Sequence, residues 1–320
     1  MFSRPFPWLI ALIAALFALV PAWAGSVQLR ESLLLAAVYI TLASNLNLMI
    51  GYAGYVNFGN IVFFGLGGYF CMYLVNDWKW NLVAAALVAG GIVSALAFLF
   101  GLGILRLRGA FFALATIGVN EATRQFVANF EPWGGATGIY LSLDAYEPLG
   151  GPRQALWIVY FLLVAVMALS LALSYAIKNS KFGLGLLAIG ENEDAASILG
   201  VPTPRYKTIV YSTSAFLPAV AGGFYFFKSG IIEPTGAFDL GLSIEAIVML
   251  MLGGQGTIIG PALGAFLYEE LRGTLLTLPT FSHFQLVIAG LLLLLIVLFA
   301  PGGLMGLIRG YFPATRKFFE

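Results

Sequence analysis

The sequence predicts an all-α polytopic membrane protein with about ten transmembrane helices. Apolar residues make up 60% of the 320 residues and charged residues only 10%, whereas soluble domains hold about 45–50% and about 25% of these classes. Charge-free stretches also recur along the chain, and most are close to the roughly 20 residues that one pass needs. Because so few charges cannot cover a domain of this size in water, most of its surface must face lipid.

The charge-free stretches define the individual spans. Single passes are expected at Trp8–Ala24, Asn81–Leu105, Gln154–Ile177, Thr208–Phe227 and Phe284–Ile308. The Ser32–Asn76 stretch is long enough for two passes. Gly51-Tyr-Ala-Gly54, followed by Gly59-Asn60, offers the break between them.

Two further regions are weaker spans. Gly109–Phe130 is apolar except for Glu121 and Arg124. Between Gly241 and Arg272 lie two short apolar pieces, separated by the glycine-rich segment Gly253–Thr257. Counting these pieces as two short or broken helices gives ten passes.

The distribution of basic residues predicts the orientation. If the Lys178–Lys207 loop is cytoplasmic, both termini are also cytoplasmic, and most basic residues lie on that side, as the positive-inside rule requires. These residues are Arg4, Arg106, Arg108, Lys178, Lys181, Arg205, Lys207, Arg309, Arg316 and Lys317. The bases on the outside are Arg30, Lys79, Arg153 and Arg272. The first span also imitates a signal peptide with a small-residue cleavage site, and its removal would leave nine passes.

Several classes of function are excluded by what the chain lacks. A net charge of +1 provides no basic field for nucleic acid. With Cys71 and His283 as the lone cysteine and histidine, cysteine-cluster and paired-histidine metal sites are excluded. Phosphate-loop and serine-hydrolase motifs are also missing. We therefore expect a non-catalytic chain without a metal or cofactor site.

The loop from Lys178 to Lys207 contains a short predicted helix. It opens with Glu193 and Asp194, whose charges complement the positive end of a helix. Gly200 and Pro202 end it. Composition alone is equally compatible with a solvated amphipathic connector.

The segment Glu193-Asp194-Ala195-Ala196-x-x-x-Gly200 is similar to the E-A-A-x-x-x-G signature of ABC-importer permease subunits. Further blocks resemble the branched-chain amino-acid ABC-importer permease family, in particular its LivM-type subunit. They are Leu46–Gly59, Leu105–Thr116, Leu242–Ala265 and Pro301–Leu307, and the resemblance covers roughly residues 40–307.

Two positions depart from the pattern of that family. Members often carry serine where Asn57 stands, and Thr-Gly-Gly where Trp133-Gly134-Gly135 stands. Permeases of urea importers share much of the pattern. An importer of urea or another small solute is therefore the nearest alternative to one for leucine, isoleucine and valine.

The resemblance implies a single transmembrane permease domain over residues 1–320, in an inner membrane of the bacterial type. Such a subunit forms the translocation path with a second, related permease. Two cytoplasmic ABC ATPases hydrolyse the ATP, and an extracytoplasmic binding protein delivers the solute. Residues 178–207 would be the coupling loop, with the ATPase-coupling residues Glu193, Asp194, Ala195, Ala196 and Gly200.

Polar residues and glycines inside the spans are candidates for the translocation path, because buried charges and irregular backbone are costly in lipid. They are Asn45, Asn47, Gly51, Gly54, Asn57, Glu121, Arg124 and Glu245. Glu121 and Arg124, spaced i, i+3, could instead be a self-satisfied ion pair. The asparagines could instead form interhelical hydrogen bonds. Met49–Gly54 also echoes Met251–Gly256, which suggests an internal duplication.

Two other classes of protein fit the sequence less well. A secondary transporter driven by an ion gradient needs acidic residues grouped near the midplane, and here Glu121 alone lies clearly within a span. A membrane enzyme needs convergent catalytic side chains, which the sparse intramembrane acids do not provide.

Overall fold

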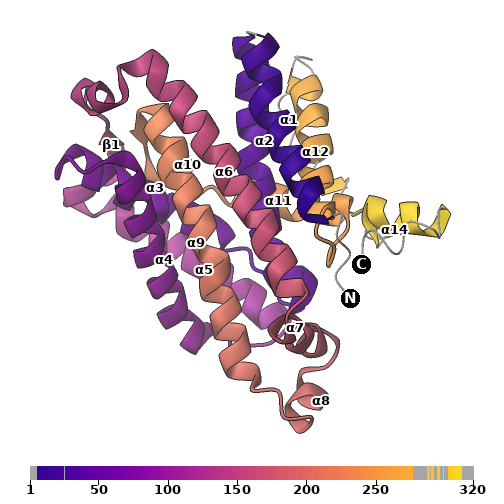
Figure 1. The fold of residues 1–320 in the computed structure, drawn as a ribbon. Helices are drawn as coiled ribbons and strands as arrows, with labels where there is room; N and C mark the ends of the chain where they lie inside the picture. Colours follow the sequence, from indigo (N-terminus) through magenta and orange to yellow (C-terminus); the bar gives the residue numbers. More distant parts are fainter. Residues whose placement is uncertain are drawn as a thin grey trace.

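The computed structural model describes residues 6–24, 26–276 and 302–311, with single positions between 287 and 298. This part of the chain is a bundle of helices (Figure 1). The longer helices are α1 (Phe6–Ala24), α2 (Val27–Asn47), α3 (Asn60–Asn76), α4 (Leu82–Ile104), α5 (Ala110–Ala128), α6 (Pro152–Lys178), α9 (Thr203–Ser229), α11 (Leu240–Gly253) and α12 (Gly260–Leu276).

Shorter elements connect and extend these helices. They are the π-helix η1 (Leu48–Tyr52), α7 (Lys181–Glu191), α8 (Glu193–Ile198), α10 (Pro234–Ala237), α14 (Gly303–Tyr311) and the 3-10 turns η2 (Glu131–Trp133), η3 (Gly135–Thr137) and η4 (Leu143–Leu149). The two strands β1 (Ile139–Tyr140) and β2 (Ile231–Ile232) pair antiparallel, with Ile139 opposite Ile232.

Within the described residues, five helical segments are long and apolar enough to cross a membrane. They are Val27–Tyr52, Leu82–Ile104, Pro152–Lys178, Thr203–Ser229 and Pro234–Gly253. Pro7–Pro21 and Asn60–Asn76 are shorter apolar helices. The all-α membrane class is thereby confirmed. The predicted span Phe284–Ile308 and the bases Arg4, Arg316 and Lys317 lie largely outside the described residues.

Helix α9 lies at the centre of the bundle and packs against α2, α3, α4 and α6. Glycines allow α3 and α9 to approach closely. A Cβ atom on Gly67 would lie 2.1 Å from the Ala219 carbonyl oxygen, and one on Gly222 would lie 1.9 Å from that of Phe64. The hydrophobic effect does not drive helices together in lipid. Close packing, which small residues allow, stabilises such contacts there instead.

Two features of the helices differ from the sequence predictions. Helix α9 begins at Thr203 rather than Thr208, so that Arg205 and Lys207 are helical. The earlier start is possible because Lys207 is buried against a carboxylate from α8. The sequence did not predict α7, which contains Gly183 and Gly185.

The two ends of the bundle carry different structures. Helices α7 and α8 lie together at one end, and β1 lies near the other (Figure 1). Long helices such as α6 and α9 run between these ends. The segments around α8 and around β2 therefore occupy opposite ends of the molecule.

Candidate functional site

The two glycine-rich breaks of the sequence lie against each other. The first is η1, where α2 changes to π geometry, a distortion common at functional sites. The second joins α11 to α12, which pack against each other as a hairpin. A Cβ atom on Gly51 would lie 2.4 Å from the backbone nitrogen of Gly256. The sequence echo between the two segments thus corresponds to a contact in space.

Asn47 holds the two breaks together. Its Nδ2 donates to the Thr257 carbonyl oxygen at 2.8 Å, and its Oδ1 accepts from the Gly256 backbone nitrogen at 2.8 Å. The side chain is fully buried. Because a buried amide is stable only when its hydrogen bonds are made, Asn47 fixes the register of α2 against the α11–α12 turn.

The first break also touches the loop that contains α7 and α8. Gly54 has φ +75°, and a Cβ atom there would lie 3.1 Å from the Cα of Gly190. In turn, a Cβ on Gly190 would lie 2.8 Å from the Tyr52 carbonyl oxygen. This contact requires glycine on both sides, so α7 and the break are in direct backbone contact.

Glu193, the first residue of α8, is the centre of an ionic cluster that faces the bundle. Its Oε1 lies 2.7 Å from Lys207 Nζ of α9, and its Oε2 lies 3.3 Å from Arg108 Nε. Tyr55 donates its hydroxyl to Oε2 at 2.5 Å. Lys207 also donates to the Leu105 carbonyl oxygen at 2.8 Å. The cluster thus joins α8 to α9, to the α4–α5 connection and to the chain that leaves the first break.

The cluster favours the charged form of Glu193. Burial raises the pKa of this carboxyl, but the hydrogen bonds from Lys207 and Tyr55 and the nearby positive charges outweigh it, so the pKa lies below its usual value. Burial, and then the hydrogen bond to Glu193, raise the pKa of Tyr55 well above its usual range. Near neutral pH the tyrosine is therefore a neutral donor to a carboxylate.

The other residues predicted to contact an ATPase lie on different sides of α8. Asp194 is exposed and pairs with Arg108 at 2.9 Å. Ala195 is exposed, whereas Ala196 is only 2% exposed and packs within the chain. Gly200 has φ +89° and ends the segment. Close approach by a partner is therefore open at Ala195 but not at Ala196.

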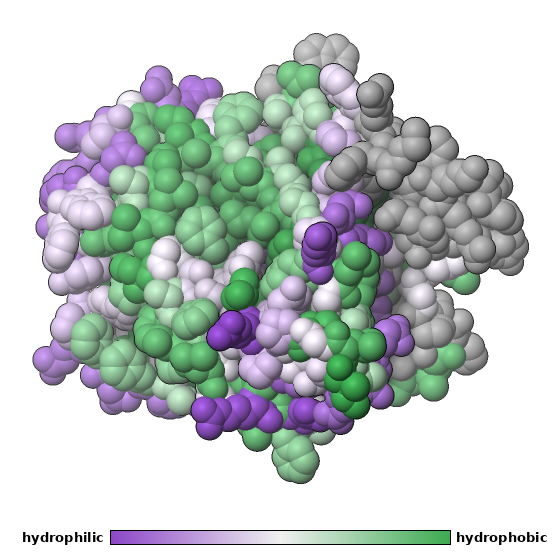
Figure 2. Space-filling model, turned by 60° about the horizontal axis from the view of Figure 1, so that its bottom comes forward, coloured by the Kyte–Doolittle hydropathy of each residue, from purple (hydrophilic) through white to green (hydrophobic). Residues whose placement is uncertain are grey.

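Two residues that the sequence reading missed dominate the outer face of this segment. Ile198 is 87% exposed and Leu199 is 82% exposed. They lie at the end of the bundle that Figure 2 brings forward, where hydrophilic residues gather along the lower edge. The available signal was a pair of adjacent apolar residues that follows the charged segment Glu191–Asp194 in the short predicted helix. Exposed apolar side chains at a polar end of a molecule mark a protein contact.

Two of the predicted path residues make hydrogen bonds that hold the bundle or its turns together. Asn45 donates its Nδ2 to Ser170 Oγ of α6 at 3.0 Å, which makes it an interhelical hydrogen bond. Asn57 is fully buried, and its Oδ1 accepts from the Gly59 backbone nitrogen at 2.9 Å. Neither residue shares the contact made by Asn47, Gly51 and Gly54.

The charged candidates lie in two separate places. Glu121 and Arg124 form the expected i, i+3 pair at 2.7 Å, but the pair faces outward on α5, with 52% of the Glu121 side chain exposed. Glu245, predicted as a path residue, lies inside the bundle. It is 6% exposed, between Tyr39, whose hydroxyl donates to it at 3.3 Å, and Arg272 at 3.9 Å. A carboxylate inside the bundle needs such partners.

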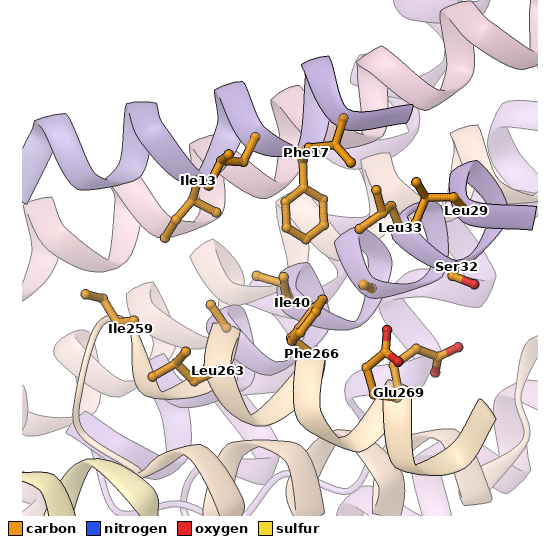
Figure 3. A pocket seen from close by; sticks show the side chains of 15 residues that line it. Ile13, Phe17, Leu29, Ser32, Leu33, Ile40, Ile259, Leu263, Phe266 and Glu269 are labelled. Carbon is orange, nitrogen blue, oxygen red and sulfur yellow. The ribbon is translucent and has the colours of Figure 1, made fainter. Parts of the chain in front are cut away.

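An apolar groove of about 440 Å³ lies between α1, α2 and α12. Figure 3 shows Ile13 and Phe17 facing Leu263 and Phe266 across it, with Glu269 at one end. Its lining residues include carboxylates but no basic side chain. Apart from Ser32, Glu269 and Glu270, the lining is aliphatic and aromatic, and Glu269 is paired with Arg272 at 3.5 Å.

Comparison with known proteins agrees with this architecture. A family model described as "Branched-chain amino acid transport system / permease component" matches residues 28–297. The chain is 26% identical over 325 residues to the high-affinity branched-chain amino acid transport system permease protein LivM of Escherichia coli (strain K12), a match that covers 93% of this chain and 75% of that protein.

Two further relatives show the breadth of the family. The chain is 26% identical over 306 residues to the LivH permease protein of the same organism, covering 87% of this chain and 94% of LivH. It is 33% identical over 148 residues to the ribose import permease protein RbsC of Bacillus subtilis (strain 168), covering 43% of this chain and 46% of RbsC. No solved structure matches the chain. Because the family model spans most of the sequence, the chain belongs to the family of permease components of branched-chain amino acid transport systems.

Proposed function

We propose that this chain is a non-catalytic permease subunit of an ATP-driven importer for branched-chain amino acids, in a bacterial-type inner membrane. A second permease completes the path, two ABC ATPases hydrolyse ATP, and a binding protein delivers the solute. The observation that carries the proposal is the Glu193 cluster, which connects an exposed helix at one end of the bundle to a helix break inside it.

The coupling loop, residues 178–207, would work as a lever with two faces. Ile198 and Leu199 form the outer face, which an ATPase groove would cover. Glu193 forms the inner face and holds Tyr55 and Lys207. Movement of the docked ATPase would therefore reach η1 and, through Asn47, the α11–α12 turn. Two packed arrangements of these elements would be the inward- and outward-open states.

The lining of the groove favours aliphatic solutes over urea. A route for urea needs hydrogen-bonding groups along its length, whereas this groove is lined mostly by aliphatic and aromatic side chains. The groove also lacks a cation for the solute carboxylate, so a zwitterion needs groups from elsewhere. A second permease that shares the path could supply the missing cation. Selection of the solute by the binding protein also agrees with a groove that lacks polar contacts.

Helix α5 supplies a face for the second permease. Its outward stripe contains Gly118, Glu121 and Gln125, and Gln125 donates to Glu121 at 2.8 Å. The exposed face of α4, with Leu87 and Val88, is apolar. Charged groups at membrane depth face protein or water rather than lipid. The stripe on α5 is therefore assigned to the subunit interface or the path beside it, and that of α4 to lipid.

The proposal is tested by purifying the chain with its cellular partners. We expect ABC ATPases in the complex, and ATPase activity that a loaded binding protein stimulates. The double variant Ile198→Asp/Leu199→Asp should lose the ATPases. The chain itself should stay inserted, because both substitutions are at exposed positions. Leu143→Asp, at the opposite end and 78% exposed, is the matched control.

Two results would reject the assignment. Full transport by this chain alone in liposomes would indicate a secondary transporter. Retention of ATPases by the Ile198→Asp/Leu199→Asp variant, equal to that of Leu143→Asp, would mean that α8 is not the docking helix.

A further inference from the structure

A cleft of about 650 Å³ lies between the end of α4 and the beginning of α9, beside the Glu193 cluster. Ser94 Oγ donates to the Ser212 carbonyl oxygen at 2.9 Å, which sets the two helices side by side. The end of α4 and the start of α9 consequently reach the same level. The cleft therefore opens where two apolar spans end, at the edge of the membrane.

The charges in the cleft leave a positive surplus. Lys207 is paired with Glu193, and Arg108 with Glu193 and Asp194. Arg106 and Arg205 also line the cleft, are exposed, and pair with no carboxylate among the described residues. Arg106 donates to the Leu102 carbonyl oxygen at 3.2 Å, which holds its side chain along α4.

The backbone adds to the positive potential. Arg205 lies in the first turn of α9, a helix of 27 residues. Thr203 N donates to the Val201 carbonyl oxygen and Pro204 has no N–H, so the positive end of α9 favours anions through its helix dipole rather than through free N–H groups of these two residues. Two arginines beside such an end attract a phosphate group more strongly than either feature alone.

The walls toward the span are apolar. Phe98 is 41% exposed, Leu102 is 51% exposed and Ile209 is 47% exposed. They lie next to the arginines in the same cleft. A small soluble anion would leave these walls uncovered, whereas a lipid covers them with its acyl chains while its phosphate meets the arginines.

From this arrangement we propose that the cleft between α4 and α9 binds an anionic phospholipid, with its headgroup phosphate on Arg106 and Arg205 and an acyl chain along Phe98, Leu102 and Ile209. Zwitterionic lipids bind less well, because the ammonium of their headgroup would compete with the arginines. The lipid would lie directly beside the contact of α8 with α9, without replacing any member of the Glu193 cluster.

The test uses the whole importer complex in detergent with added phosphatidylglycerol or phosphatidylcholine, and native mass spectrometry counts the bound lipids. Each arginine near an anionic surface contributes about fivefold in affinity, so Arg106→Gln/Arg205→Gln should bind phosphatidylglycerol roughly twenty-five-fold more weakly. The control Lys79→Gln/Arg153→Gln removes the same charge from exposed positions elsewhere and should bind as the native protein does.

A second variant separates a lipid from a free anion. Leu102→Trp fills the apolar wall and keeps both arginines, so it should also lower retention of phosphatidylglycerol. Thermal melting of each variant shows that the bundle is intact. Arg106→Lys/Arg205→Lys, which keeps the charge, should recover most of the binding.

Three results would overturn the proposal. One is equal phosphatidylglycerol retention by the two charge-removing double variants. Another is displacement of the lipid by inorganic phosphate together with normal binding by Leu102→Trp, which would indicate a simple anion site. The third is loss of ATPase subunits from Arg106→Gln/Arg205→Gln at unchanged lipid retention, which would assign the cleft to the ATPase.

Discussion

Glu193 turns its carboxylate into the bundle rather than outward from α8. The signature to which it belongs suggests a docking surface, yet its carboxylate turns inward to Lys207, Tyr55 and Arg108. Its neighbour Asp194 is exposed instead. The type of residue at each position was predictable from sequence. The direction of each side chain was not, because Lys207 and Tyr55 come from distant segments.

At the residue scale, we predict that Glu193→Gln lowers the stability of the chain near neutral pH. It weakens the charged hydrogen bond that the buried Lys207 donates, and a bond of this kind contributes about 1.5–3 kcal/mol. Asp194→Asn removes a pair between exposed side chains and should lower stability less than Glu193→Gln does. The measurement is the melting temperature of the purified protein.

The difference in stability between the native protein and Glu193→Gln should also depend on pH. The folded-state pKa of Glu193 lies below the ordinary value of 4.5, so its stabilising contribution is present above pH 4.5 and is lost as the pH falls through the folded pKa. The melting difference between native protein and Glu193→Gln should therefore shrink below pH 4.5. A difference that stays constant down to full protonation would show that the charge of Glu193 is not what stabilises the cluster.

At the scale of elements, the helices that sequence reasoning located best are those with long charge-free runs, such as α4 and α6. Helix α7 was missed because glycine is a poor helix former. Its glycines are required by packing, since a Cβ atom on Gly185 would lie 2.4 Å from the Tyr206 ring. The contact between the two breaks was likewise visible in sequence only as a short echo, because it depends on Asn47.

The contact between the breaks predicts the effect of one methyl group. In Gly51→Ala the new Cβ would lie 2.0 Å from Asn47 Oδ1 and 2.4 Å from Gly256 nitrogen, and overpacking of this kind costs about 1–3 kcal/mol. Gly91→Ala, on an open face of α4, should stabilise by up to about 1 kcal/mol. Thermal melting compares the two. Equal melting temperatures would mean that the breaks separate easily.

At the scale of the whole molecule, the outward faces of the helices are of two kinds. The exposed side of α4 is apolar, as a surface against lipid should be, whereas α5 exposes an ion pair among apolar side chains such as Phe111, Leu114 and Phe126. Sequence reasoning placed Glu121 and Arg124 within a span and paired them. It could not decide whether the pair faced inward, since the periodicity of a single helix does not say what surrounds it.

These faces predict where the second permease binds. Gly118→Trp adds bulk to the stripe of α5, and Gly91→Trp adds the same bulk to α4; both positions have open space around them. The α5 variant should recover at least about tenfold less of the second permease, as a loss of about 1.4 kcal/mol in association gives. The α4 variant should recover a normal amount. Co-purification from membranes measures both. Loss of the second permease in the α4 variant alone would mean that α4, and not α5, forms the interface.

The two hydrogen bonds of the Asn47 side chain also have a consequence for biosynthesis. Its partner Thr257 lies 210 residues further along the chain, so the irregular backbone after α2 enters the bilayer long before the segment that covers it. Until then the Asn47 side-chain amide lacks the Thr257 and Gly256 partners, in a solvent that cannot hydrogen-bond it. A chain truncated before α11 should therefore be degraded faster in the cell than the full chain. Insertion of the α11–α12 hairpin is the step expected to stabilise the chain against degradation.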